Sequence, residues 1–498
     1  MIGQNTKKSV QLKMNAFDQQ KYIKLQSEKI LERVSKFKKL YLEFGGKLFD
    51  DHHISRCLPG FDPDTKIKML LNIKEKVEVI ITIAAEDIES GKRRHDVGIS
   101  YEDYTIQLIE SFKDVGLLVN SVVINKFDSQ PSVITYKRKL EQRSIKVHLF
   151  NKIMGYPTNV DLVLSDRGFG VNPFIQTTKP IVLITSPGAK SGKMGVGLSQ
   201  LYHEAKNGNK KAGFAKFETV PVWNLPLRHP LNIAYEASTV NINDVNVIDH
   251  YHFEKYGVVA VNYNRDIEAF PLLQNIFRHI YGKDIYHSPT DMGVNMVGFC
   301  INDNAAVEAA CKQEIIRRYF ETLCYFKQGK VGEDTVSRMV LLMKQLSLNP
   351  TDRGVVVHTA KLQEKESKHS ASIQLSTGEI LSATANGFTS ASSELLLKAV
   401  GKLLSLNSKI RIIPDNIMQK TTELKTQILG EKRFHLRLGE ILVILASSAV
   451  TNELSAHALD AIKQLKGAEV HTSYMISDEE SMVWKRLGVN LTQEPVLG

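Results

Sequence analysis

The amino-acid sequence predicts an α/β protein built on a largely parallel β-sheet. Short and almost wholly apolar runs alternate with segments of helical periodicity, which is typical of buried parallel strands joined by helices. Polar or glycine-rich loops follow several of these runs, at the position where ligands bind in such sheets. A chain of 498 residues is too long for one hydrophobic core, so we expect two or three domains.

The N-terminal part of the chain shows the clearest alternation. Ile23, Ile30 and Val34 recur at nearly helical spacing, and Asp62 followed by Pro63 is typical of a helix start. In order, we predict helix 16–38, strand 40–44, helix 63–76, strand 77–84, helix 101–115, strand 121–125, helix 131–143, strand 147–150 and strand 181–185. These elements predict a Rossmann-like sheet, with the loops 45–51, 85–94 and 186–192 converging at one edge.

A polar junction at residues 346–353 divides the rest of the chain. Apolar residues spaced by three and four predict helices over 303–345. Beyond the junction, we predict strands 355–360, 371–374, 380–385, 410–413 and 442–446, and a helix over 390–404. The predicted division is an N-terminal α/β domain over 1–302, a helical section over 303–350 and a smaller C-terminal α/β domain over 351–498.

The composition, with 43% hydrophobic and 24% charged residues, is that of a soluble globular protein. Apolar runs such as 441–446 are far too short to cross a bilayer, and residues 1–15 form a polar lead-in without the apolar core of a signal peptide. The cysteines form no CxxC pair, so we expect free thiols in a reducing cytoplasm. They are Cys57, Cys300, Cys311 and Cys324.

The net charge is +10, but the lysines and arginines are spread along the chain. No compact basic block with interleaved aromatic residues is present, which disfavours nucleic acid as a partner. The excess of positive charge fits an anionic small-molecule ligand, or simple solubility, at least as well as it fits nucleic acid.

A P-loop-like turn joins the strand 181–185 to a following helix through the sequence Pro-Gly-Ala-Lys-Ser-Gly-Lys-Met. Glycines let backbone N–H groups close around oxygens, the helix start supplies a positive dipole, and lysines supply charge. Met194 stands where a Ser or Thr would bind Mg²⁺. The alternative is a turn that needs glycine only for close packing. The predicted phosphate-binding residues are Gly188, Lys190, Ser191, Gly192 and Lys193.

A second polar segment brings Asp249 next to His250 and His252. On a strand, the two histidines would point the same way. With Asp249 they could form a metal site or an acid–base pair, and hydrogen-bonded structural histidines are the alternative.

Further candidates follow a predicted strand at 258–261. Arg265 and Asp266 lie where a substrate loop would be, and Asp291 lies in a structured turn. Asp291 either caps a helix or supplies a carboxylate. We therefore predict that Asp249, Arg265, Asp266 and Asp291 provide general-base, anion and metal contacts.

Three functional classes fit these residues. The first is a cytoplasmic ligase or phosphotransferase that acts on a phosphorylated small molecule, with a nucleotide and Mg²⁺ as the candidate cofactor. The second is a ligand-binding regulator without catalysis. The third is a structural or assembly protein, a homo-oligomer whose polar loops make subunit contacts.

Five long blocks of the sequence resemble a known family of large bacterial proteins. They are LYLEFGGKLFDDHHISRCLPGFDP, SPGAKSGKMGVGLSQLYHE, AKFETVPVWNLPLRHPLNIAYEA, AVNYNRDIEAFP and SPTDMGVNMVGF. The family carries only the label of a domain of unknown function, so the resemblance assigns no catalytic residue. It implies an N-terminal α/β region, a helical section and a C-terminal α/β domain of deaminase-like topology.

The chain differs from the deaminases in its C-terminal domain, and from the usual family sequence at the P-loop-like turn. The C-terminal domain has no Cys beyond Cys324 and lacks the zinc motif of the deaminases, which argues against a zinc deaminase. The family usually has Pro-Gly-Pro-Gly-Ser-Gly-Lys-Met at the turn, whereas this chain has Ala189 and Lys190 at the third and fourth positions. Met194 is therefore usual for the family.

Overall fold

The computed structural model describes residues 16–94, 98–156, 158–209, 211–407, 409–432 and 435–497. The polar lead-in predicted for residues 1–15 lies outside them. The chain forms two compact units. Of the described residues, the N-terminal unit contains 16–236 and 243–311, and the C-terminal unit contains 237–242 and 312–497.

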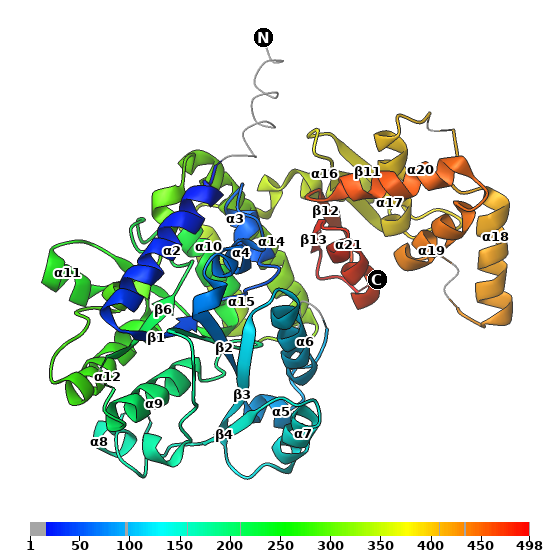
Figure 1. Ribbon diagram of the computed structural model, residues 1–498. Coiled ribbons are helices and arrows are strands. Elements are labelled where there is room, and N and C mark those ends of the chain that lie inside the picture. Colours follow the sequence, from blue (N-terminus) through cyan, green and yellow to red (C-terminus); the bar gives the residue numbers. More distant parts are fainter. Residues whose placement is uncertain are drawn as a thin grey trace. The chain divides into compact units, whose positions relative to one another are not determined.

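In the described residues, the N-terminal unit is built on a seven-stranded parallel sheet with the order β4-β3-β2-β5-β1-β6-β9 (Figure 1). The strands are β1 (Lys39–Phe44), β2 (Val77–Ala84), β3 (Leu118–Phe127), β4 (Val147–Asn151), β5 (Ile181–Thr185), β6 (Ala212–Phe217) and β9 (Gly293–Val294). All residues of β2, β5 and β6 are buried, which explains their near-continuous apolar sequence.

Helices join these strands and cover the sheet. They are α2 (Gln19–Lys36), α3 (His52–Cys57), α4 (Thr65–Leu71), α5 (Ala85–Glu89), α6 (Tyr101–Asp114), α7 (Pro131–Glu141), α8 (Val160–Val163), α9 (Lys193–Lys206), α10 (Pro230–Ser238), α11 (His250–Tyr256), α12 (Asn264–Tyr281) and α13 (Pro289–Met292). A two-stranded ribbon, β7 (Asn246–Ile248) with β8 (Val261–Tyr263), precedes α12.

The strand order changes direction at the centre of the sheet. From β2 the chain continues to β3 on one side, whereas from the neighbouring β5 it continues through α9 to β6 on the other side. Parallel crossovers are almost always right-handed, so connections that lead in opposite directions lie on opposite faces of the sheet. The loops that follow β2 and β5 therefore flank the point where the strand order changes direction, which is where ligands bind in open α/β sheets.

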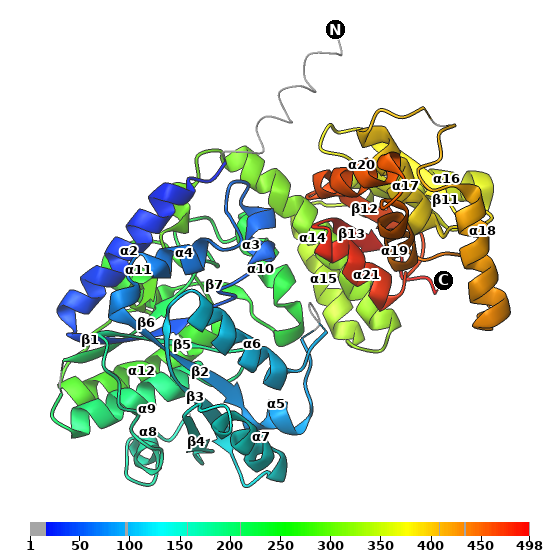
Figure 2. The same ribbon diagram turned by 45° about the vertical axis from the view of Figure 1, so that its right-hand side comes forward.

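One face of the sheet near β6 is covered by α9 and α12. Phe214 and Lys216 point to the same face because they are two residues apart on β6. Phe214 lies against Gly197 of α9, and Lys216 forms an ion pair with Asp266 in the first turn of α12. Figures 1 and 2 show these two helices side by side beneath β1 and β6.

The C-terminal unit contains a four-stranded sheet with the order β11-β10-β12-β13 among its described residues. The first strand, β10, is antiparallel to both neighbours, and β12 and β13 are parallel, which is the deaminase-like arrangement that the resemblance implied. Its elements are α15 (Glu333–Gln345), α16 (Gly354–Glu366), β10 (Ser370–Gln374), β11 (Ile380–Thr384), α17 (Ala391–Leu403), α18 (Asp415–Glu423), α19 (Leu438–Ser448), α20 (Glu453–Ile462), β12 (Glu469–Thr472), α21 (Asp478–Arg486) and β13 (Asn490–Gln493). The helix α14 (Asn304–Lys327) spans the boundary between the units along the chain.

Three strand predictions in the C-terminal unit were wrong. Residues 355–360 belong to α16, residues 442–446 belong to α19, and residues 410–413 form no strand. Leu438, Ile441 and Leu445 are buried at spacings of three and four, so α19 buries one helical face. A short apolar run cannot distinguish such a helix from a buried strand.

The α/β fold class is confirmed for both units. No helix in the described part of the chain is long and apolar enough to cross a membrane. The division at residues 302 and 350 stays a prediction.

Candidate functional site

A polar cluster lies at the carboxyl edge of the N-terminal sheet, where β5, β1 and β6 end side by side. Glu43, near the end of β1, is opposite Ile184 of β5 and Lys216 of β6 in the strand register. Side chains at matching register positions point to the same face. Glu43 and Lys216 are therefore neighbours at the face where α9 and α12 begin.

The turn after β5 leads directly into α9. Gly192 precedes the helix with a φ of +84°, and a Cβ atom at this position would collide with Nδ2 of Asn125. A Cβ atom at Gly188 would collide with the phenol of Tyr101. Close packing alone thus explains both glycines, as the alternative of a structural turn predicts.

The charge at this turn comes from Lys193, the first residue of α9. Lys193 is half-buried, and its ammonium lies 3.4 Å from the hydroxyl of Ser186. Loss of water contact lowers the pKa of Lys193; the charges of Lys216 and Arg265 act in the same direction, and Glu43 opposes them. Within the described residues, no carboxylate forms an ion pair with Lys193.

Two further turn residues differ in their surroundings. Ser191 is buried, and its hydroxyl has no hydrogen-bond partner in the described structure. Its carbonyl oxygen accepts a hydrogen bond of 3.3 Å from Thr82. Lys190 is exposed, with a φ of +63°. The first N–H groups of α9 have no intrahelical acceptor, and no side chain caps them.

Lys216 is the centre of the buried part of the cluster. Its ammonium is 2.7 and 2.5 Å from the two carboxylate oxygens of Asp266 and 3.5 Å from Glu218, and it also donates to the hydroxyl of Tyr263. Burial opposes its charge, but the nearby carboxylates of Asp266, Glu218 and Glu43 outweigh burial and raise the pKa of Lys216.

Glu218 is a carboxyl group of this cluster with a raised pKa. Burial raises its pKa from 4.5 to about 7; Lys216 opposes this effect, and the negative charges of Asp266 and Glu43 add to it. One carboxylate oxygen of Glu43 is buried and has no hydrogen-bond partner among the described residues. A carboxyl group that titrates near neutral pH is suited to accept or donate a proton.

Arg265 lies next to this cluster but is already paired. Its guanidinium contacts both carboxylate oxygens of Asp244, at 2.5 and 2.7 Å. Asp244 is almost fully buried and also accepts a hydrogen bond of 3.0 Å from the hydroxyl of Tyr235. This pair ties the loop before β7 to the start of α12.

Asp249 and Asp291 lie in another group, around α11 and α13. Asp249 is fully buried and caps α11 by accepting from the amide of His252, and it also accepts from the amide and hydroxyl of Thr290. Asp291 accepts from the hydroxyl of Tyr256 and the amide of His287. Both aspartates thus have structural contacts.

The expected strand placement of His250 and His252 was wrong. Both residues lie in the first turn of α11, because Asp249 starts a helix there. The Nδ1 atom of His252 is 2.9 Å from the hydroxyl of Ser288. No group of three or more His, Cys, Asp or Glu side chains in the described structure is arranged to hold a metal ion.

The structure therefore brings Lys193, Arg265 and Asp266 to one edge of the sheet, and it places Asp249 and Asp291 in a separate group. Sequence reasoning missed Glu43, Lys216 and Glu218. A signal was present, because all three are charged residues in or directly after strands whose other residues are almost all apolar.

These features define a two-unit α/β protein with a polar site at the carboxyl edge of its larger sheet. Residues 15–347 match the family described as "Domain of unknown function DUF1846, N-terminal", and residues 351–498 match its C-terminal counterpart. The chain belongs to this family, which confirms the resemblance found in the sequence.

Similar proteins cover almost the whole chain. A UPF0371 protein of Clostridium botulinum (strain Langeland) is 46% identical over 488 residues, which are 96% of this chain and 97% of the relative. A UPF0371 protein of Clostridium tetani (strain Massachusetts) has the same identity and coverage. Their names give the family and no activity.

Proposed function

We propose that the N-terminal unit binds a phosphorylated small molecule, with a nucleotide as the candidate, at the carboxyl edge of its sheet. The observation that carries the proposal is the half-buried Lys193, which starts α9 and whose ammonium has no ion-pair partner within the described residues. A bound phosphate would receive this charge together with the N–H groups of residues 191–193.

The position in the fold supports the same ligand class. The turn follows the central strand β5, next to the point where the strand order changes direction. Phosphates bind at helix starts at such positions because the backbone N–H groups and the helix dipole both favour an anion. Since the described residues offer no ready-made metal cluster, Mg²⁺ would take its ligands mainly from the phosphates and water.

The neighbouring carboxyl groups support a proton-transfer step on the bound molecule. Glu218 has a pKa of about 7, so it can accept a proton from a substrate hydroxyl or amine, and Glu43 has a buried carboxylate oxygen without a hydrogen-bond partner in the described structure. Activation of such a nucleophile beside a phosphate is the chemistry of a phosphotransferase or ligase. Asp266 holds Lys216 in place in this scheme.

Isothermal titration calorimetry with ATP, ADP and ribose 5-phosphate, each with and without Mg²⁺, tests the binding. We expect Lys193→Ala to weaken binding at least about tenfold, because a charge-assisted contact to phosphate is lost. Lys206→Ala is the matched control, since Lys206 lies at the other end of α9 and pairs with the exposed Asp166. Unchanged affinity in a well-folded Lys193→Ala protein would contradict the proposal.

An assembly role is the second candidate function. Leu424, Ile428 and Leu429 are large apolar residues that lie close together in the sequence and are exposed by 45, 75 and 64%. Such an exposed group fits a subunit contact in a homo-oligomer. Light scattering coupled to size-exclusion chromatography tests this role, which is supported by a defined oligomer that Ile428→Glu converts to the monomer.

A further inference from the structure

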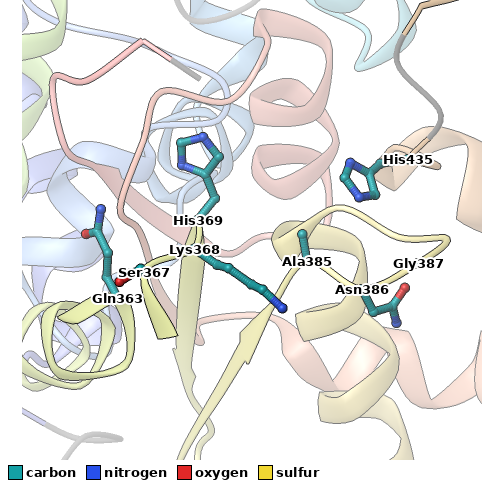
Figure 3. Close-up of a pocket in the computed structure, with 8 residues that line it drawn as sticks. All are labelled: Gln363, Ser367, Lys368, His369, Ala385, Asn386, Gly387 and His435. Carbon is teal, nitrogen blue, oxygen red and sulfur yellow. The ribbon is translucent and has the colours of Figure 1, made fainter. Parts of the chain in front are cut away.

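A pocket of about 750 Å³ lies within the C-terminal unit. It is bounded by the end of α16, the start of β10 and the loop between β11 and α17. Figure 3 shows Lys368 extending toward Ala385 and Asn386, with His369 and His435 on either side. Pockets of this volume hold small molecules up to the size of a nucleotide.

The lining of this pocket is basic. Lys368, His369 and His435 line it together with Gln363 and Asn386, and none of its lining residues is Asp or Glu. The side-chain nitrogen of Asn386 already donates to Glu394, and the ring of His435 has a hydrogen bond with the backbone of Asn386. Lys368 and His369 are therefore the lining residues that can supply charge and an N–H group to a ligand.

No ion pair within the described residues neutralises Lys368. The ammonium of Lys368 can therefore attract an anion that enters the pocket.

Hydrogen bonds hold the loop beside the pocket in one conformation. The side-chain oxygen of Asn386 accepts from the amides of Phe388 and Thr389, each at 2.8 Å, and its nitrogen donates to Glu394 at 2.7 Å. On the opposite side, the ring of His369 lies 4.3 Å from that of Tyr474. Groups fixed in this way lose little freedom when a ligand binds.

We propose that this pocket is a second ligand site, which binds a small organic anion through a phosphate or carboxylate group. Lys368 provides the charge, and the imidazole of His369 provides an N–H donor beside it. This site is independent of the proposed function of the N-terminal unit, because none of its lining residues belongs to that unit.

Calorimetry on the full chain tests the proposal in the Lys193→Ala background, which weakens the N-terminal site. The probes are AMP for a phosphate ester and citrate for a carboxylate. We expect at least one probe to bind with one molecule per chain, and Lys368→Ala with His369→Ala to weaken that binding at least tenfold, as expected for the loss of two polar contacts. Lys365→Ala is the matched control, since Lys365 is an exposed lysine of α16 outside the pocket.

The outcomes separate the two sites. Binding that persists in Lys193→Ala and is lost on changing Lys368 and His369 supports the pocket, and the probe that binds identifies the anionic group. The proposal is overturned if neither probe binds, or if the pocket variants keep full affinity while their melting temperatures match the parent protein. Loss of binding in Lys193→Ala alone would instead assign the probe to the N-terminal site.

Discussion

At the scale of single residues, Glu218 makes the stability of the protein depend on pH. Its pKa is about 7 in the folded state and near 4.5 when the chain is unfolded, so the folded state holds the proton over this range. The folded state is therefore favoured below pH 4.5, and this contribution is lost as the pH rises to about 7. The cause is burial, together with the negative charges of Asp266 and Glu43.

We expect Glu218→Gln to remove this dependence. Relative to the variant, the free energy of unfolding of the parent protein should fall by roughly 3 kcal/mol between pH 4.5 and pH 7.5. Urea unfolding at several pH values measures it, with the exposed Glu254→Gln as the control. Parallel pH profiles for the parent protein and Glu218→Gln would show that Glu218 titrates normally.

Gly192 is a residue whose backbone and surroundings both require glycine. Its φ is +84°, and a Cβ atom would displace the Asn125 side chain, which donates to the carbonyl oxygens of Ser191 and Gly192. We expect Gly192→Ala to lower the free energy of unfolding by about 2–3 kcal/mol. Chemical denaturation measures the loss.

Gly208→Ala separates the cost of backbone strain from the cost of displacing Asn125. Gly208 ends the same α9 segment with the same φ of +84°, but it has nothing within 4 Å of the added Cβ atom among the described residues. Its substitution should cost about 1 kcal/mol, from backbone strain alone. Equal losses at the two positions would mean that the Asn125 contact contributes nothing.

At the scale of elements, the ion pair of Lys216 and Asp266 joins β6 to α12. Both side chains are almost fully buried, so removal of one partner leaves a charge with poor solvation. We expect Asp266→Asn to lower the free energy of unfolding by about 3–5 kcal/mol, and the double variant Lys216→Met with Asp266→Leu to be less affected. Thermal and urea unfolding measure both.

The same helix offers a control for this pair. Asp284 follows α12 and pairs with Arg278 near the surface, so Asp284→Asn should cause a much smaller loss. If Asp266→Asn kept full stability, Asp266 would be free for the catalytic role that its sequence position suggested.

Elements with a single strong pattern could be predicted from the sequence, and others could not. The apolar runs at 77–84 and 181–185 were predicted correctly as strands, because buried parallel strands need no alternation. The run at 442–446 was equally apolar but lies in α19. The charged residues around Lys193 could not be predicted from the sequence, because Glu43 and Lys216 become its neighbours only through the order of strands in the sheet.

At the scale of the whole molecule, the core of the C-terminal sheet is supplemented by α14. Arg317 donates to Asn490 at 3.2 Å, and the ring of Phe320 lies 4.9 Å from that of the buried His471. Residues 371–489 supply the rest of this core. The C-terminal family match begins at residue 351, so it includes the C-terminal sheet but leaves out α14, which packs against that sheet.

We expect a fragment of residues 312–498 to melt at least about 5 °C above a fragment of residues 351–498, because it keeps these contacts. Differential scanning calorimetry measures both transitions. Phe320→Ala in the longer fragment should move its transition toward that of the shorter one. Identical transitions in the two fragments would show that α14 adds no stability to the C-terminal sheet.

The contact of Asn125 with the turn at Ser191 and Gly192 has a consequence for recognition. Asn125 lies on β3, two strands away from β5 in the sheet, so the turn is braced by the sheet itself. The entropy of ordering the turn is thus lost when the chain folds and not when a ligand arrives. A receptor ordered in advance selects its ligand by shape and charge, and it cannot adapt to a poorly fitting one.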